Sequence, residues 1–91
     1  MYAVRLSITG RVQGVGYRAW AVQVAARLGV RGWARNRADG SVEALMIGDE
    51  TAVAAMIEAC RRGPRAASVT EVAVSEAKDD GSPDFSACPS V

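Results

Sequence analysis

The stretch VRGWARNRADGSVEALMI, residues 30–47, decides how the rest of the chain folds. Val30–Arg37 and Ser41–Ile47 are two runs of strand-like composition, and the dipeptide Asp39-Gly40 lies between them. Asp-Gly at such a place predicts a tight β-hairpin, in which both central residues of the turn take positive φ. The hairpin supplies two neighbouring antiparallel strands, and the segments on either side are assigned relative to it.

A strand and a helix are predicted before the hairpin. Tyr2–Thr9 alternates between apolar and polar residues, which is typical of a half-buried strand. Arg18–Leu28 carries apolar residues at helical spacing, and Gly29 supplies a C-terminal stop. The apolar positions of this helix are Trp20, Ala21, Val24, Ala25 and Leu28.

A helix and a strand are predicted after the hairpin. Asp49 is a suitable N-terminal cap for a second helix, which Gly63-Pro64 ends. Its apolar positions are Val53, Met56, Ile57 and Cys60. Ser68–Glu76 reads as a fourth strand. Lys78–Pro83 is polar and predicts a loop, after which Phe85–Cys88 is a candidate for a short edge strand of uncertain register.

The order of these elements indicates the fold class. Two right-handed crossovers around a central hairpin give the split βαβ, or ferredoxin-like, arrangement. We therefore predict an α+β sandwich (βαββαβ) that residues 1–91 form as a single domain. Its sheet is antiparallel and carries both helices on one face.

Composition excludes several classes of function. The chain has 91 residues, of which 49% are hydrophobic and 23% charged, as in ordinary globular proteins. A net charge of +1 does not support a general nucleic-acid or membrane partner, so attraction for an anion must be local. No apolar run approaches the length of a membrane span, and the first residues lack a signal-peptide pattern. We expect a cytoplasmic protein.

The cysteines and the absence of histidine limit the catalytic groups and metal sites that the chain can form. With no histidine, Ser-His and Cys-His nucleophiles and most zinc sites are excluded. Cys60 and Cys88 form no CxxC pair, and we expect reduced thiols, with a disulfide between them as the alternative. A cysteine phosphatase needs C-x₅-R on a strand-to-helix loop. Cys60 instead lies late in a helix, and Ala66 stands where the arginine belongs.

A glycine-rich stretch, GRVQGVGYRA at residues 10–19, joins the first strand to the first helix. Gly14 and Gly16 permit a sharp turn that leaves amide N–H groups facing outward at a helix N-terminus, where anions bind. Arg18 is unfavourable for the helix dipole there, but its planar fork suits phosphate oxygens. The alternative is a plain tight turn with Arg18 in water. The stretch also fits a dinucleotide fingerprint, which we reject because the second strand leads into a hairpin.

Three segments resemble the acylphosphatase family. The stretch GRVQGVGYR (10–18) is similar to its G-x-V-Q-G-V-x-[FY]-R signature. GWARN (32–36) and GPRAASV (63–69) are similar to two further family segments. Order and spacing hold from about Tyr2 to Ala77, and the family fold is the ferredoxin-like sandwich. The polar stretch before the last strand departs from the family pattern.

The resemblance implies hydrolysis of the carboxyl–phosphate bond of a small-molecule acyl phosphate, with inorganic phosphate as product and inhibitor. By match, the catalytic residues are Arg18, which binds the phosphoryl group, and Asn36, which holds the attacking water. The substrate-binding amides belong to Gln13, Gly14, Val15, Gly16, Tyr17 and Arg18. Family members need no metal or other cofactor and form no phosphoenzyme, and we expect a monomer.

Two readings from other classes remain beside the enzyme. An RNA-binding module shares this fold, and Arg31–Ala34 imitates the start of an RNP1 string. Arg35 then stands where an aromatic residue is needed for stacking on bases. A domain kept only for protein interaction has no reason to retain both Arg18 and Asn36. For Trp20 and Trp33 we expect core packing, and for Tyr17 a ring that packs on the domain and shapes the glycine-rich loop.

Overall fold

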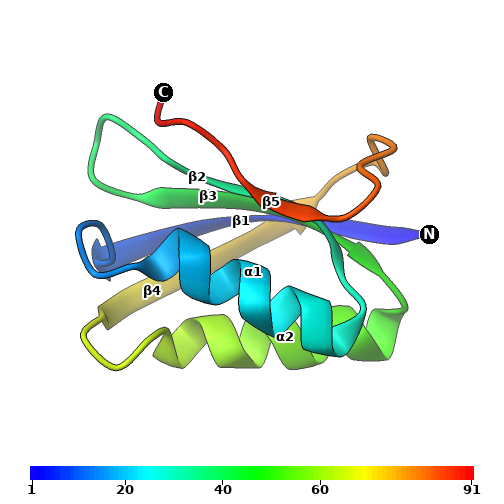
Figure 1. The fold of residues 1–91 in the computed structure, drawn as a ribbon, viewed down its shortest axis with the longest axis horizontal. Coiled ribbons are helices and arrows are strands. Elements are labelled where there is room, and N and C mark those ends of the chain that lie inside the picture. The colour runs from blue at the N-terminus through cyan, green and yellow to red at the C-terminus, as the bar shows by residue number, and fades with distance from the viewer.

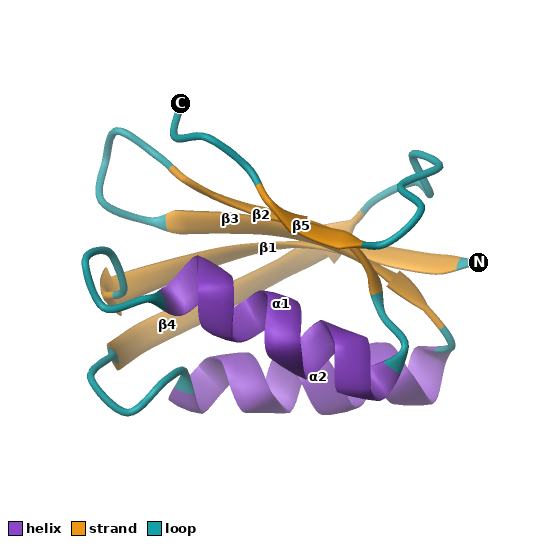
Figure 2. Cartoon of the chain, in the orientation of Figure 1, coloured by secondary structure: helices purple, strands orange, loops and turns teal.

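Five strands and two helices follow one another in a computed structural model that describes residues 1–91 (Figure 2). They are β1 (Tyr2–Arg11), α1 (Tyr17–Leu28), β2 (Arg31–Asn36), β3 (Val42–Gly48), α2 (Glu50–Arg62), β4 (Ser68–Glu76) and β5 (Phe85–Ala87). The first six lie where the hydrophobic periodicity predicts them, within one or two residues at most ends. Neither helix is long and apolar enough to cross a membrane.

The strands form one sheet in the order β4-β1-β3-β2-β5. The neighbouring pairs among β1 to β4 are antiparallel, as predicted, but β5 pairs in parallel with β2. The expectation of a wholly antiparallel sheet is therefore wrong at this edge. The chain leaves β4 at one outer edge and crosses the end of the sheet to the other. It then enters β5 in the direction of β2 (Figure 1).

Both helices cover one face of the sheet, and the main core lies between the two layers (Figure 1). Alternation along the strands turns every second side chain toward the helices. From the two central strands the core takes Val4, Leu6, Ile8, Val42, Ala44 and Met46. From the helices it takes Tyr17, Ala21, Val24, Ala25, Val53, Met56 and Cys60. Trp20 packs against this core, whereas Trp33 packs against a smaller cluster of Ala3, Leu45 and Ile47.

The β2–β3 hairpin has a longer turn than the two-residue type predicted. The Arg37 N–H donates to the Ser41 carbonyl at 2.9 Å, and the Gly40 N–H donates to the Arg37 carbonyl at 3.1 Å. Only Gly40 has positive φ, so the prediction for Asp39 is wrong. The Asp39 carboxylate instead accepts hydrogen bonds from the Ser41 hydroxyl and N–H, which hold the pKa of Asp39 below its usual value. These bonds stabilise a wider turn.

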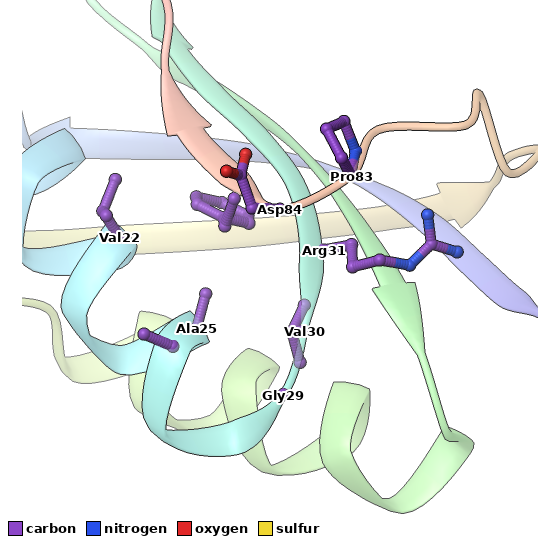
Figure 3. Close-up of a pocket in the computed structure, with 9 residues that line it drawn as sticks. Val22, Ala25, Gly29, Val30, Arg31, Pro83 and Asp84 are labelled. Carbon is purple, nitrogen blue, oxygen red and sulfur yellow. The ribbon is translucent and has the colours of Figure 1, made fainter.

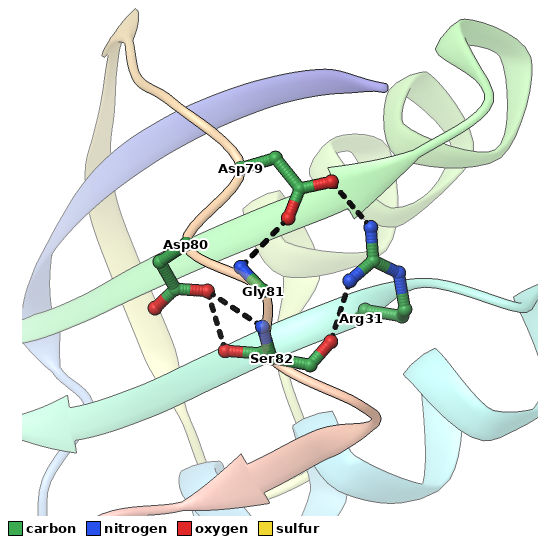
Figure 4. Close-up of polar contacts among 5 residues, drawn as sticks. All are labelled: Arg31, Asp79, Asp80, Gly81 and Ser82. Atoms are coloured by element: carbon green, nitrogen blue, oxygen red, sulfur yellow. Dashed lines mark hydrogen bonds and ion pairs between the residues drawn. The ribbon is translucent and has the colours of Figure 1, made fainter.

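Two further features predicted from the sequence, the Asp49 cap and the polar loop before the last strand, lie at the opposite end of the molecule. Asp49 occupies the N-cap position of α2, but its side chain makes no capping hydrogen bond. The polar segment before β5 is ordered by Arg31 (Figure 4). The Arg31 guanidinium donates to the Asp79 carboxylate at 2.6 Å and to the Ser82 carbonyl at 2.5 Å. These bonds hold the segment at the edge of β2, so that β5 can pair there.

Candidate functional site

Three connections and the C-terminus gather at one end of the sandwich (Figure 1). They are the glycine loop (residues 12–16) between β1 and α1, the β2–β3 hairpin, the α2–β4 connection, and the chain after β5. This arrangement follows from the topology, because β1 and β2 both end here and β3 and β4 both begin here. The residues predicted for the site lie on these segments or next to them: Gln13 to Gly16 in the glycine loop, Tyr17 and Arg18 in the first turn of α1, and Asn36 at the end of β2.

The glycine loop leaves a row of backbone donors unused by the protein. Gly14 and Gly16 have φ of 74° and 77°, and Gly16 is the N-cap of α1 without a side-chain cap. The amides of residues 13–19 donate no hydrogen bond within the chain, and the first that does is Trp20, to Gly16 at 3.0 Å. A Cβ added at Gly14 or Gly16 would meet no atom within 4 Å, so both border open space. Free amides at a helix N-terminus attract anions.

Two side chains hold the glycine loop against the main core. Val15 is half-buried and packs against the main core. Tyr17 is 2% exposed, and its hydroxyl donates to the Cys60 carbonyl at 2.7 Å, at the end of α2. Burial raises the pKa of Tyr17 far above its ordinary value, so the phenol stays protonated. The Tyr17 ring thus shapes the loop as expected, and only its backbone amide remains for an anion.

Arg18 lies in the first turn of α1, where no acidic residue accompanies it. Its Nη1 donates to the carbonyl oxygen of Cys88 at 2.7 Å, and the side chain forms no ion pair. A guanidinium has five N–H donors. The single protein contact therefore orients the group while its charge and other donors remain for a ligand.

Asn36 is the last residue of β2 and is half-buried. Its backbone carbonyl accepts a hydrogen bond from the Val91 N–H at 3.0 Å, while its side-chain amide makes no hydrogen bond to the protein. Arg18 contacts Cys88 and Asn36 contacts Val91, which lie three residues apart in the tail after β5. Three residues span at most about 11 Å. Both predicted catalytic residues therefore contact the same short tail, at one end of the sandwich.

The Gln13 side chain lies where the sequence does not predict it. Its Nε2 donates to the carbonyl oxygens of Arg37 and Ser41, at 2.8 and 2.9 Å. The side chain thus joins the glycine loop to the hairpin, whereas the backbone amide of Gln13 stays free. The tail at Cys88–Val91 is likewise absent from the site that the sequence predicts. The tail acts through main-chain atoms, which leave no side-chain signal in a sequence.

Other groups in the molecule do not form a competing site. Cys60 and Cys88 are free thiols, the first buried and the second half-buried, so the disulfide alternative is not realised. Residues of the His, Cys, Asp and Glu types form no cluster suited to a metal ion. A cavity of about 410 Å³ lies at the other end of α1, lined mainly by apolar residues such as Val22, Val30 and Phe85 (Figure 3). It is remote from the glycine loop.

Comparisons with known proteins agree with one another. The protein-family model described as Acylphosphatase matches residues 4–87. An acylphosphatase of Rhodospirillum rubrum is 50% identical over 91 residues, which cover 100% of both chains. One of Rhodopseudomonas palustris is 59% identical over 76 residues, covering 84% of this chain and 77% of that protein. The crystal structure of acylphosphatase from Bacillus subtilis aligns with a TM-score of 0.92 at 37% identity, covering 97% of this chain and 99% of the other.

Proposed function

The chain belongs to the acylphosphatase family and is an enzyme that hydrolyses acyl phosphates, and we propose that it does so without a metal ion. In this proposal the amides of residues 13–18 and the Arg18 guanidinium hold the phosphoryl group. The Asn36 side chain holds the attacking water. The observation that carries the proposal is the row of unused amides at a helix N-terminus, beside an arginine that forms no ion pair.

Binding of the phosphoryl group follows from the charges at the loop. The N-terminus of α1 carries about half a positive charge, and the free amides point the same partial charge outward. Arg18 adds a full positive charge whose planar fork fits two phosphoryl oxygens. Together these groups offset the charge of a dianion that loses its hydration shell on entering the loop.

Turnover needs positioning more than strong acid–base groups. Phosphoryl transfer passes through a loose transition state with the attacking and leaving oxygens roughly in line. The Asn36 amide can orient a water through its carbonyl oxygen and NH₂ group. The bond between phosphorus and the carboxyl oxygen breaks while the water oxygen bonds to phosphorus. A phosphoryl oxygen takes the proton of the water, and the weakly basic carboxylate leaves without protonation.

The test is phosphate release from benzoyl phosphate by purified protein, with and without EDTA. We expect equal rates in both conditions and competitive inhibition by inorganic phosphate. Phenyl phosphate is the matched control substrate. Its phenoxide leaving group is much more basic than a carboxylate, so we expect phenyl phosphate to be hydrolysed far more slowly. Loss of activity in EDTA would overturn the metal-free mechanism, and phosphate that fails to compete would remove the glycine loop as the phosphoryl site.

We further propose that the enzyme acts as a monomer in the cytoplasm on free small molecules. The net charge of +1 supports the choice of a small-molecule substrate, since it favours neither a polyanionic nor a membrane partner. Size-exclusion chromatography with light scattering should give the mass of one chain, 9.5 kDa, across micromolar concentrations. A stable dimer mass would contradict the proposal.

A further inference from the structure

The Gln13 side chain is the hydrogen-bonded link between the two halves of the proposed site. One half is the glycine loop, which holds the phosphoryl group, and the other is the hairpin that carries Asn36. The two N–H bonds of one amide nitrogen reach two carbonyl oxygens, those of Arg37 and Ser41. No other hydrogen bond connects residues 12–16 with residues 37–41.

The two acceptors flank Asn36 in the hairpin. Arg37 follows Asn36 directly in the chain, and Ser41 precedes Val42, the residue that pairs with Asn36 across the strands. The hairpin turn is braced internally by the Arg37–Ser41 bond and by the Asp39 carboxylate. It is therefore a rigid unit whose tip, residues 37–40, is exposed and has little packing to fix it against the loop.

From this arrangement we propose that Gln13 is a positioning residue for the hydrolytic water, acting through Asn36. Its amide sets the separation between the loop that holds phosphorus and the strand end that holds the water. An error of about 1 Å in such a separation can lower a rate about 100-fold. The inference rests on the proposed function, because it assumes that Asn36 orients the water.

The inference separates the task of the Gln13 side chain from that of its backbone. The backbone amide belongs to the anion cradle and survives any substitution except proline. Removal of the side-chain donors should therefore lower turnover and leave phosphate binding intact. If the side chain merely stabilised the fold, its removal would not lower turnover while leaving phosphate binding intact.

The test is a double-mutant cycle of Gln13→Met and Asn36→Ala, with benzoyl phosphate as substrate. Methionine matches glutamine in length and lacks the donors. We expect Gln13→Met to lower kcat about 10- to 100-fold, with the inhibition constant of inorganic phosphate within about twofold of the wild type. Because Gln13 acts through Asn36, the double variant should lose no more than Asn36→Ala alone. Gln23→Met, at an exposed position of α1, is the matched control and should leave kcat unchanged.

The outcomes distinguish the inference from the proposed function. If Gln13→Met retains wild-type kcat while Asn36→Ala is impaired, only the inference is overturned. The same holds if the two losses multiply, or if phosphate affinity falls as much as kcat. If Asn36→Ala itself keeps wild-type kcat, the water-binding role of Asn36 fails and the inference fails with it. Circular dichroism checks that each variant is folded. Gln13→Ala is a second variant without the side-chain amide, for use if Gln13→Met does not fold.

Discussion

The Nη1 group of Arg18 donates a hydrogen bond of 2.7 Å to the carbonyl oxygen of Cys88, 70 residues further along the chain. Cys88 is itself fixed, because its N–H donates to the Ala34 carbonyl of β2 at 2.8 Å. The side chain that we propose to hold the phosphoryl group is thus oriented by the tail after β5. An ordered guanidinium loses less conformational freedom when it binds an anion.

A chain shortened after Ala87 should therefore be a poorer enzyme with an intact fold. It loses the carbonyl that orients Arg18 and the Val91 N–H that bonds to Asn36, while the core stays complete. We expect kcat/KM for benzoyl phosphate to fall about tenfold, the equivalent of one charge-assisted hydrogen bond of about 1.4 kcal/mol. Val91→Ala keeps the backbone donor and should remain at the wild-type rate. Full activity of the shortened chain would contradict a role for the tail.

Arg18→Ala should remove most of the transition-state stabilisation. Arginines that clamp a transferring phosphoryl group contribute a factor of about a thousand or more. We expect kcat/KM to fall on this order and the affinity for inorganic phosphate to fall as well, because the guanidinium contacts both species. Arg18→Lys keeps the charge but loses the fork, and should lie between the two. Arg27→Ala, in the last turn of the same helix, is the control that should change neither quantity.

The sequence predicts the parts of this protein that depend on side-chain pattern. The strand-like patterns of β1 to β4 and the helical spacing in α1 and α2 place six elements correctly, since burial of one face selects the period. The direction of β5 is not predictable in this way, because a three-residue strand carries almost no pattern and its pairing depends on where Arg31 holds the preceding loop. The Asp39-Gly40 signal identifies the hairpin but not its turn type, which the bonds from Ser41 to the Asp39 carboxylate decide.

The two cysteines should differ strongly in reactivity. Burial raises the pKa of the Cys60 thiol to about 11, so that little thiolate exists at pH 8, and 1% exposure blocks reagents. Cys88 is half-buried and directly follows β5. Iodoacetamide at pH 8 should therefore add to Cys88 well before Cys60, as read by mass spectrometry of peptides. In urea both should react alike, and equal rates in the native protein would show that α2 opens readily.

Gly32 should be the least replaceable glycine of the sheet. Its φ is 131°, and a Cβ built there would overlap the carbonyl oxygen of Leu45 in the neighbouring strand. Gly32→Ala must therefore separate β2 from β3 or distort the backbone. We expect the free energy of unfolding to fall by about 3 kcal/mol or more, which adds a steric clash to the cost of about 1 kcal/mol for a strained φ. Gly81→Ala, at φ 81° with no atom within 4 Å of the added Cβ, is the matched control for the φ cost alone. Urea denaturation of the three proteins measures the difference, and similar midpoints for Gly32→Ala and Gly81→Ala would show that the strands separate without cost.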